Sequence, residues 1–143
     1  MGGYDLMLHR TLFIGRWVAD FIFAPDGYDI GEVTATLYDM GASDSIVGRT
    51  VDLMTYGGLN TGFTFTNADN LSAIVVIGPT SSRDEFINTL VHEVHHLAVA
   101  IAENLGIDLE SETPAYLAGD SAQRLADLVC ELGCPHCGGK YSC

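Results

Sequence analysis

The strongest helix signal in the chain is the stretch SRDEFINTLVHEVHHLAVAIAENLG at residues 82–106. Ser82 stands three residues before Glu85, which is the spacing of a capping box, and the acidic first turn suits the positive end of the helix dipole. Gly106 is a typical residue for the C-terminal end of a helix. The apolar residues recur at helical spacing and predict one side that packs on a core, made of Leu90, Val94, Leu97, Ala98, Ile101 and Leu105.

Inside this helix, residues 92–96 read HEVHH and contain a complete HExxH motif. At about 100° per residue, His92 and His96 leave the same face, so both imidazoles can reach one tetrahedral zinc ion. Glu93 is displaced by roughly 100° around the helix and can act on a water at the metal without being a ligand. The motif predicts a Zn²⁺ site with two histidine ligands and a glutamate as general base. The alternative is a chance match whose histidines are ordinary polar residues on a solvated face.

A catalytic zinc site usually takes three protein ligands and leaves one position for water. The metzincin extension is excluded, because Val99 and Ala102 stand where that motif needs Gly and His. Glu103 shares the histidine face but lies about 10 Å further along the helix axis than His96, too far for direct ligation. The remaining downstream candidates are the carboxylates Asp108, Glu110, Glu112 and Asp120.

Glu112 is the best placed of these carboxylates. It stands at the head of a last helix, predicted to begin near Ser111 or Thr113 and to continue towards Leu132, and the preceding glycine turn would fold this helix back on the HExxH helix. Glu112 is therefore the predicted third ligand, and the alternative is an acid favoured by a helix N-terminus. Tyr116 lies one turn further on the same face, where its hydroxyl could stabilise a developing oxyanion; core packing is its other candidate role.

The HExxH helix followed by ETPAYL at residues 112–117 resembles the gluzincin arrangement, in which a second helix supplies a glutamate ligand. It is similar in particular to small zincin-like proteins encoded by tailed phages and prophages of gut bacteria, and the similarity covers roughly residues 60–120. The resemblance implies three ligands and a base, namely His92, His96 and Glu112 with Glu93. It also implies that residues 71–77 form the edge strand beside the cleft, where zincins hold an extended peptide by strand addition.

One position departs from this pattern. A typical gluzincin second helix carries Asp four residues after its Glu, where this chain has Tyr116. His95 and Asp120 are then the residues to consider for supporting the ligands through a hydrogen bond.

The rest of the sequence predicts an α+β fold. Residues 8–23 are rich in β-branched and aromatic side chains and predict one long strand, whereas residues 29–40 and 44–54 predict helices. Residues 60–66 alternate polar and aromatic side chains and residues 71–77 form a continuous apolar run, so both predict strands. We expect a small zincin-like domain in which a short mixed sheet packs on the HExxH helix and the following C-terminal helix.

Length and charge set the broad class. The 143 residues suit one domain, which we assign to residues 1–129, followed by a Cys-rich C-terminal tail at 130–143. With 19 acidic and 6 basic residues the net charge is −13, which repels phosphate backbones and anionic lipids. We therefore expect neither nucleic acid nor a membrane as partner. Arg16 and Asp20 interrupt the apolar stretch 12–24, so it is neither signal peptide nor membrane span, and we expect a cytoplasmic protein.

The tail holds all four cysteines, Cys130, Cys134, Cys137 and Cys143. Such clustering cannot staple a secreted domain and fits a reducing compartment. The tail contains one CxxC, and no second CxxC at a distance completes a zinc ribbon. We expect thiols that bind metal adventitiously or make an intermolecular contact, with a structural second zinc as the alternative.

Together these patterns predict a zinc-dependent peptidase that hydrolyses peptide bonds of a peptide or protein substrate, with a zinc-activated water and Glu93 as general base. The alternative from another class is a phage-type structural or interaction protein that retains a zincin scaffold without turnover. Glu93 argues against it, because a purely structural zinc site does not need a base. Two further alternatives are a zinc hydrolase with another substrate and a zinc-binding adaptor that works through the tail.

Overall fold

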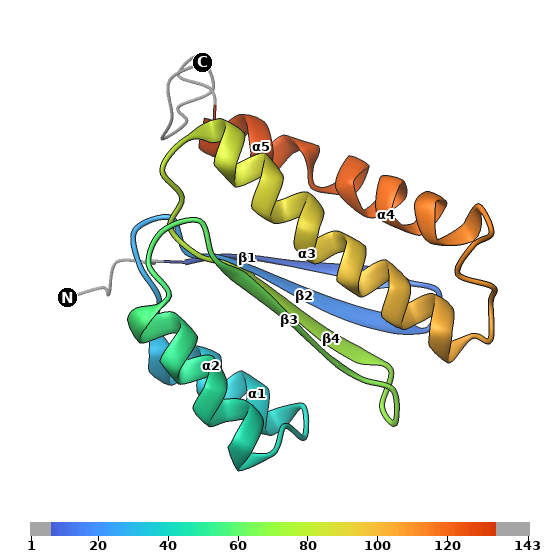
Figure 1. The fold of residues 1–143 in the computed structure, drawn as a ribbon, viewed down its shortest axis with the longest axis horizontal. Coiled ribbons are helices and arrows are strands. Elements are labelled where there is room, and N and C mark those ends of the chain that lie inside the picture. The colour runs from blue at the N-terminus through green and yellow to red at the C-terminus, as the bar shows by residue number, and fades with distance from the viewer. Residues whose placement is uncertain (1–6, 134–143) are drawn as a thin grey trace.

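A four-stranded sheet lies between two layers of helices (Figure 1). The computed structural model describes residues 7–133. The elements in chain order are β1 (Leu8–Ile14), β2 (Trp17–Phe23), α1 (Ile30–Asp39), α2 (Asp44–Tyr56), β3 (Gly62–Asn67), β4 (Ser72–Ile77), α3 (Arg83–Asn104), α4 (Thr113–Arg124) and α5 (Ala126–Gly133). The predicted α+β class is confirmed. None of the helices in the described part of the chain combines the length and apolar character needed to cross a membrane.

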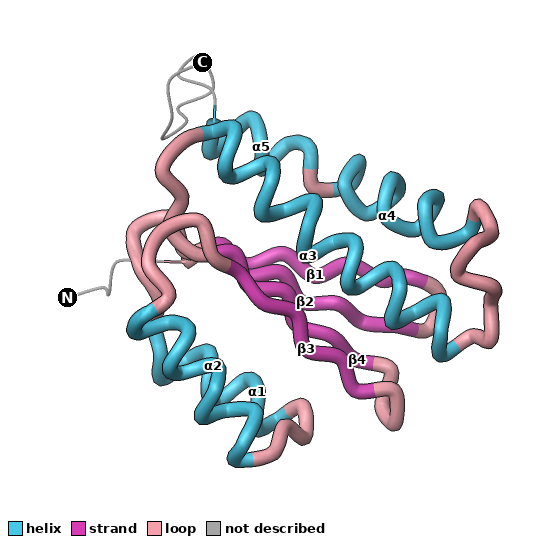
Figure 2. Tube along the Cα trace, in the orientation of Figure 1, coloured by secondary structure: helices cyan, strands magenta, loops and turns pink. Residues whose placement is uncertain are grey.

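The strands of the sheet follow the order β1-β2-β4-β3 (Figure 2). Strands β2 and β4 are parallel and the other neighbours are antiparallel, so the sheet is mixed as predicted. The expectation that residues 71–77 form the edge strand is wrong, because β4 lies inside the sheet and β3 lies at its edge. Five of the six residues of β4 are buried. A continuous apolar run suits a strand that is covered on both faces.

Two cores lie on the two faces of the sheet. On one face, Phe21 and Val75 pack with Leu97 of α3, in a cluster that also includes residues of α5. On the other face, Ile74 packs with Leu37 of α1 in a cluster that also includes residues of α2. Successive residues of a strand point to opposite faces, so β2 and β4 supply side chains to both clusters. The HExxH helix is thereby held against one face of the sheet.

The single long strand predicted over residues 8–23 is wrong. The chain forms two antiparallel strands, β1 and β2, in which Ile14 lies opposite Trp17. Gly15 has a φ of +59°, a conformation that lets the chain reverse within two residues. The β-rich composition is the same on both sides of the turn, so only the Gly15-Arg16 pair marks it in the sequence.

The last predicted helix is two helices, which is a further correction. Helix α4 ends at Arg124, and its C-cap residue Leu125 has a φ of −104° and a ψ of 0°, which depart from helical values, before α5 begins. Leu125, Leu128 and Leu132 are all buried in the core beside α3. A change of direction lets the three leucines reach that core. Because Leu132 packs there, the predicted boundary at residue 129 falls inside α5, and the folded part extends beyond it.

Candidate active site

Helix α3 begins and ends as the sequence predicts. The Ser82 hydroxyl accepts a hydrogen bond of 3.1 Å from the backbone N–H of Glu85, and Gly106 has a φ of +69° just after the C-cap residue Leu105. Most of the predicted apolar side is buried, namely Leu90, Val94, Leu97, Ala98 and Ile101. Leu105 is the exception at 59% exposed, and it is the C-cap residue that follows the last residue of α3.

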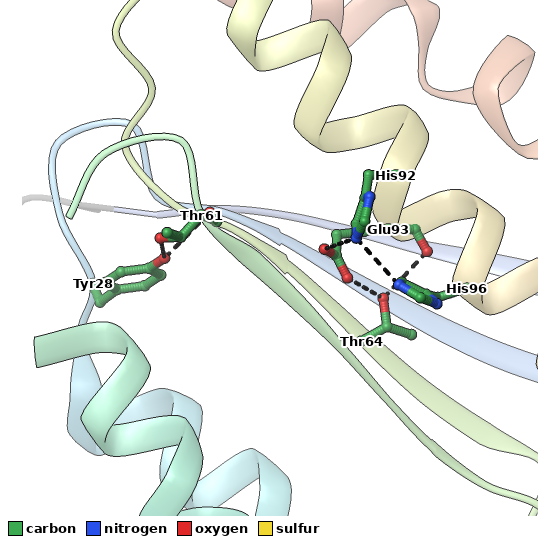
Figure 3. A network of polar contacts seen from close by, with 6 residues as sticks. All are labelled: Tyr28, Thr61, Thr64, His92, Glu93 and His96. Atoms are coloured by element: carbon green, nitrogen blue, oxygen red, sulfur yellow. Dashed lines mark hydrogen bonds and ion pairs between the residues drawn. The ribbon is translucent and has the colours of Figure 1, made fainter. Parts of the chain in front are cut away.

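His92 and His96 extend from the exposed side of α3 towards one point (Figure 3). Their Nε2 atoms lie 3.2 Å apart, and the His92 side chain is 66% exposed. Two nitrogens that each lie ~2.0–2.1 Å from a tetrahedral zinc ion are about 3.3 Å apart. The spacing of the two imidazoles therefore fits two ligand positions of one zinc ion.

Glu93 lies beneath the histidine pair, between α3 and β3, and is only 5% exposed. The hydroxyl of Thr64 on β3 lies 2.9 Å from Oε1 of Glu93 and 3.2 Å from its backbone oxygen, positions in which it donates to either. The other carboxylate oxygen, Oε2, lies 3.8 Å from Nε2 of His92 (Figure 3). The carboxylate therefore has one oxygen held by the sheet and one beside the histidines.

Strand β3 approaches α3 closely at Gly62. A Cβ atom added there would lie 3.1 Å from Cγ of Glu93 and 3.2 Å from Cγ2 of Thr89, both on α3, and 2.7 Å from the backbone oxygen of Val76 on the neighbouring strand β4. Gly62 and Thr64 face α3, whereas Phe63 packs against the core on the α1 and α2 side. Sequence reasoning missed both α3-facing residues. The alternation of residues 60–66 was the signal that could have found them.

A cavity of about 300 Å³ lies beside Glu93. Asn88 and His92 of α3 line it on one side, and Leu53 of α2 and the residues leading into β3 line it on the other. Among these, Asn60 is tied to the loop before α3, because its Oδ1 accepts from the backbone N–H of Ser81 at 2.8 Å and its Nδ2 donates to the Ser81 hydroxyl at 3.0 Å. The cleft expected beside the histidines thus adjoins His92, whereas His96 does not line it.

Tyr28 lies beside the residues that lead into β3, with its hydroxyl 3.2 Å from Oγ1 of Thr61 (Figure 3). Burial raises the pKa of Tyr28, the hydrogen bond with Thr61 partly offsets this, and the negative charge of Glu93 raises the pKa further. Tyr28 therefore keeps its proton at neutral pH.

Glu112 lies at the start of α4 and is exposed. Helix α4 packs on α3 and runs antiparallel to it (Figure 1), so its first residues lie beside the C-terminal end of α3, roughly two turns beyond His96. Within residues 7–133, no three His, Cys, Asp or Glu side chains are grouped so that they could hold a metal ion. The structure therefore brings His92, Glu93 and His96 together but does not add Glu112 to them. Its role as third ligand stays a prediction.

Comparisons with family models, with curated proteins and with solved structures find no match for this chain. The resemblance to gluzincins therefore rests on the motif residues, and the function has to be argued from the geometry of the site.

The remaining candidate residues surround this site at greater distance. Tyr116 is 72% exposed, so core packing is wrong for it, and its role at an oxyanion stays a prediction. Asp120 forms an ion pair of 2.6 Å with Arg124. His95 is not part of the Nε2 pair formed by His92 and His96, and its ring centroid lies 6.3 Å from that of His96. His9 forms a surface ion pair of 3.1 Å with a glutamate of α1.

The predicted tail lies largely outside the described residues. Cys134, Cys137 and Cys143 follow residue 133, and the side chain of Cys130 is not described either. The second zinc site considered for these cysteines stays a prediction.

Proposed function

We propose that the chain is a zinc-dependent peptidase of the HExxH type, related to the zincins. One observation carries the proposal: the Nε2 atoms of His92 and His96 lie 3.2 Å apart, and Oε2 of Glu93 lies 3.8 Å from the first of them. Two imidazoles at the spacing of zinc ligands, next to a buried carboxylate that is not itself a ligand, form the donor set of a hydrolytic zinc site.

The residues divide into ligands and a base. His92 and His96 would hold Zn²⁺, with Glu112 as the proposed third ligand. When bound, the zinc ion would lower the pKa of a water towards ~7 and polarise the substrate carbonyl. Glu93 would take the proton of the attacking water and pass it to the leaving amine as the C–N bond breaks. The enclosure of Glu93 between α3 and β3 limits competition from bulk water.

The surroundings favour an extended peptide as substrate. Within the described residues, β3 pairs only with β4, so its other edge is open to a further strand. An extended peptide can hydrogen-bond to such an edge, with alternate side chains entering neighbouring pockets. The cavity beside Glu93 lies at the start of β3 and could receive one of them. We place this activity in a reducing cytoplasm, because the four cysteines cluster in the last part of the chain.

The test is cleavage of a mixed peptide library by wild type and by Glu93→Gln at equal zinc loading, read by mass spectrometry. Glutamine keeps the size of the side chain but cannot accept the proton, so hydrolysis should fall by at least ~10²-fold while zinc stays bound. Glu103→Gln is the matched control, because this residue lies on the same helix but is exposed and outside the site. It should cleave like wild type.

Two outcomes would change the proposal. Equal cleavage by wild type and Glu93→Gln would remove Glu93 as the base. Cleavage of nothing by either protein would favour the structural or interaction protein that retains a zincin scaffold.

A further inference from the structure

The two carboxylate oxygens of Glu93 lie in different surroundings. Oε1 lies 2.9 Å from the hydroxyl of Thr64, whereas Oε2 lies 3.8 Å from Nε2 of His92 (Figure 3). Within the described residues, Thr64 is the only side chain that hydrogen-bonds to this carboxylate. The two oxygens are therefore not equivalent, although the sequence shows only a glutamate.

Thr64 contacts Glu93 at two atoms, and Gly62 leaves the space that the Glu93 side chain occupies. The hydroxyl of Thr64 also lies 3.2 Å from the backbone oxygen of Glu93, so one side chain of β3 touches both the backbone and the carboxylate of the same residue on α3. At Gly62 the absence of a Cβ leaves room for the stem of Glu93, since an added methyl group would lie 3.1 Å from its Cγ. A rotation of the Glu93 side chain that moves its carboxylate would break the hydrogen bond between Thr64 and Oε1.

A hydroxyl that donates to Oε1 leaves the lone pairs of Oε2 available. Oε2 is also the oxygen nearer to the histidine pair, where the attacking water would be bound. Holding a catalytic group in one orientation raises the rate, because less of its freedom is lost on the way to the transition state.

We propose that Thr64 is a positioning residue that holds Oε1 of Glu93, so that Oε2 is the atom that receives the proton of the attacking water. This inference rests on the proposed function and assigns a role within the same site. The hydroxyl of Thr64 would touch neither the metal nor the reacting atoms and would act only through Glu93.

The test compares Thr64→Val, Thr64→Ser and a matched control. Valine has the shape of threonine without the hydroxyl, and serine keeps the hydroxyl. Thr66→Val is the control, because Thr66 lies two residues further on the same face of β3 and makes no hydrogen bond to Glu93. On folded protein at equal zinc loading, kcat should fall on the order of tenfold in Thr64→Val with KM unchanged, since a hydrogen bond to a charged group is lost. Thr64→Ser should restore most of kcat, and Thr66→Val should match wild type.

A second measurement does not depend on turnover. Crystal structures of wild type and Thr64→Val should show the Glu93 carboxylate in one orientation in wild type and displaced or in several orientations in the variant. Wild-type kcat in Thr64→Val with an unmoved Glu93 would overturn the inference. If wild type cleaves no peptide, the proposed function fails, and an unmoved Glu93 in the variant structure would then overturn the positioning role independently.

Discussion

The two edges of the sheet differ in what holds them. At β1, Arg10 donates to both carboxylate oxygens of Asp127 on α5, at 3.1 and 2.8 Å, and Arg124 donates to the backbone oxygen of Phe13 at 2.7 Å. At β3, the contacts with the neighbouring helix are a glycine and a threonine hydroxyl against buried Glu93. One edge is tied by exposed ion pairs and the other by close contacts with one buried side chain.

The difference shows where the molecule tolerates change. Exposed ion pairs contribute little to stability, because water and salt screen them and long side chains lose freedom on pairing. An added methyl group at Gly62 has no such margin, because it would meet the backbone oxygen of Val76 on β4 at 2.7 Å as well as side chains of α3. We therefore expect larger effects on metal binding and stability from substitutions in β3 and in the part of α3 that packs on it than from substitutions along β1.

The largest expected effect is on metal binding by the histidine pair of α3, the helix that packs on β3. His92→Ala or His96→Ala should each remove about one equivalent of zinc, since the pair supplies two ligands of one site. Elemental analysis of purified protein measures this directly. His95→Ala is the control: this exposed neighbour is not part of the pair and should keep its zinc. Wild-type zinc content in both His92→Ala and His96→Ala would refute the site.

Gly62→Ala should give the next largest effect. Its Cβ would lie 2.7 Å from the Val76 backbone oxygen on β4, so β3 or β4 must shift, and the free energy of unfolding should fall by about 1–3 kcal/mol. Urea unfolding followed by circular dichroism measures it.

The matched control for this variant is Gly48→Ala in α2. A Cβ at Gly48 meets nothing within 4 Å, and alanine favours a helix over glycine, so this variant should be more stable by about 0.5–1 kcal/mol. Equal effects of the two substitutions would show that the approach at β3 is not tight.

The smallest expected effect is at β1. The hydrogen bond from Arg10 holds the pKa of Asp127 below its ordinary value of 3.8. A lowered pKa contributes stability above the ordinary value, and the contribution is lost as the pH falls through the lowered one. Asp127→Asn should therefore unfold at a slightly lower urea concentration than wild type at pH 7. The difference should shrink towards pH ~2, where the wild-type carboxylate loses its charge. A change larger than that of Gly62→Ala would reverse the ranking of the two edges.

Much of α3 could be predicted from the sequence alone. The cap at Ser82, the turn at Gly106 and the shared face of His92 and His96 follow from residues within a few positions of one another. These features depend on helical geometry and local hydrogen bonds, which a sequence pattern reports directly. For this reason the sequence was enough to place His92, Glu93 and His96 together on this helix.

The place of β4 in the sheet could not be predicted in this way. An apolar run indicates burial but not which strands lie beside it, and the order of the sheet depends on contacts across the whole chain. The hairpin at Gly15 and the break at Leu125 were missed because composition changes little across either.

The sequence by itself determined most of the elements, the capping of the HExxH helix and the presence of two imidazoles and a carboxylate on it. Only the tertiary structure decided which strand lies under that helix, and hence that Thr64 contacts a glutamate 29 positions further along the chain. Local propensity and periodicity act over a few residues, whereas such a contact exists only once two cores have packed on the two faces of one sheet.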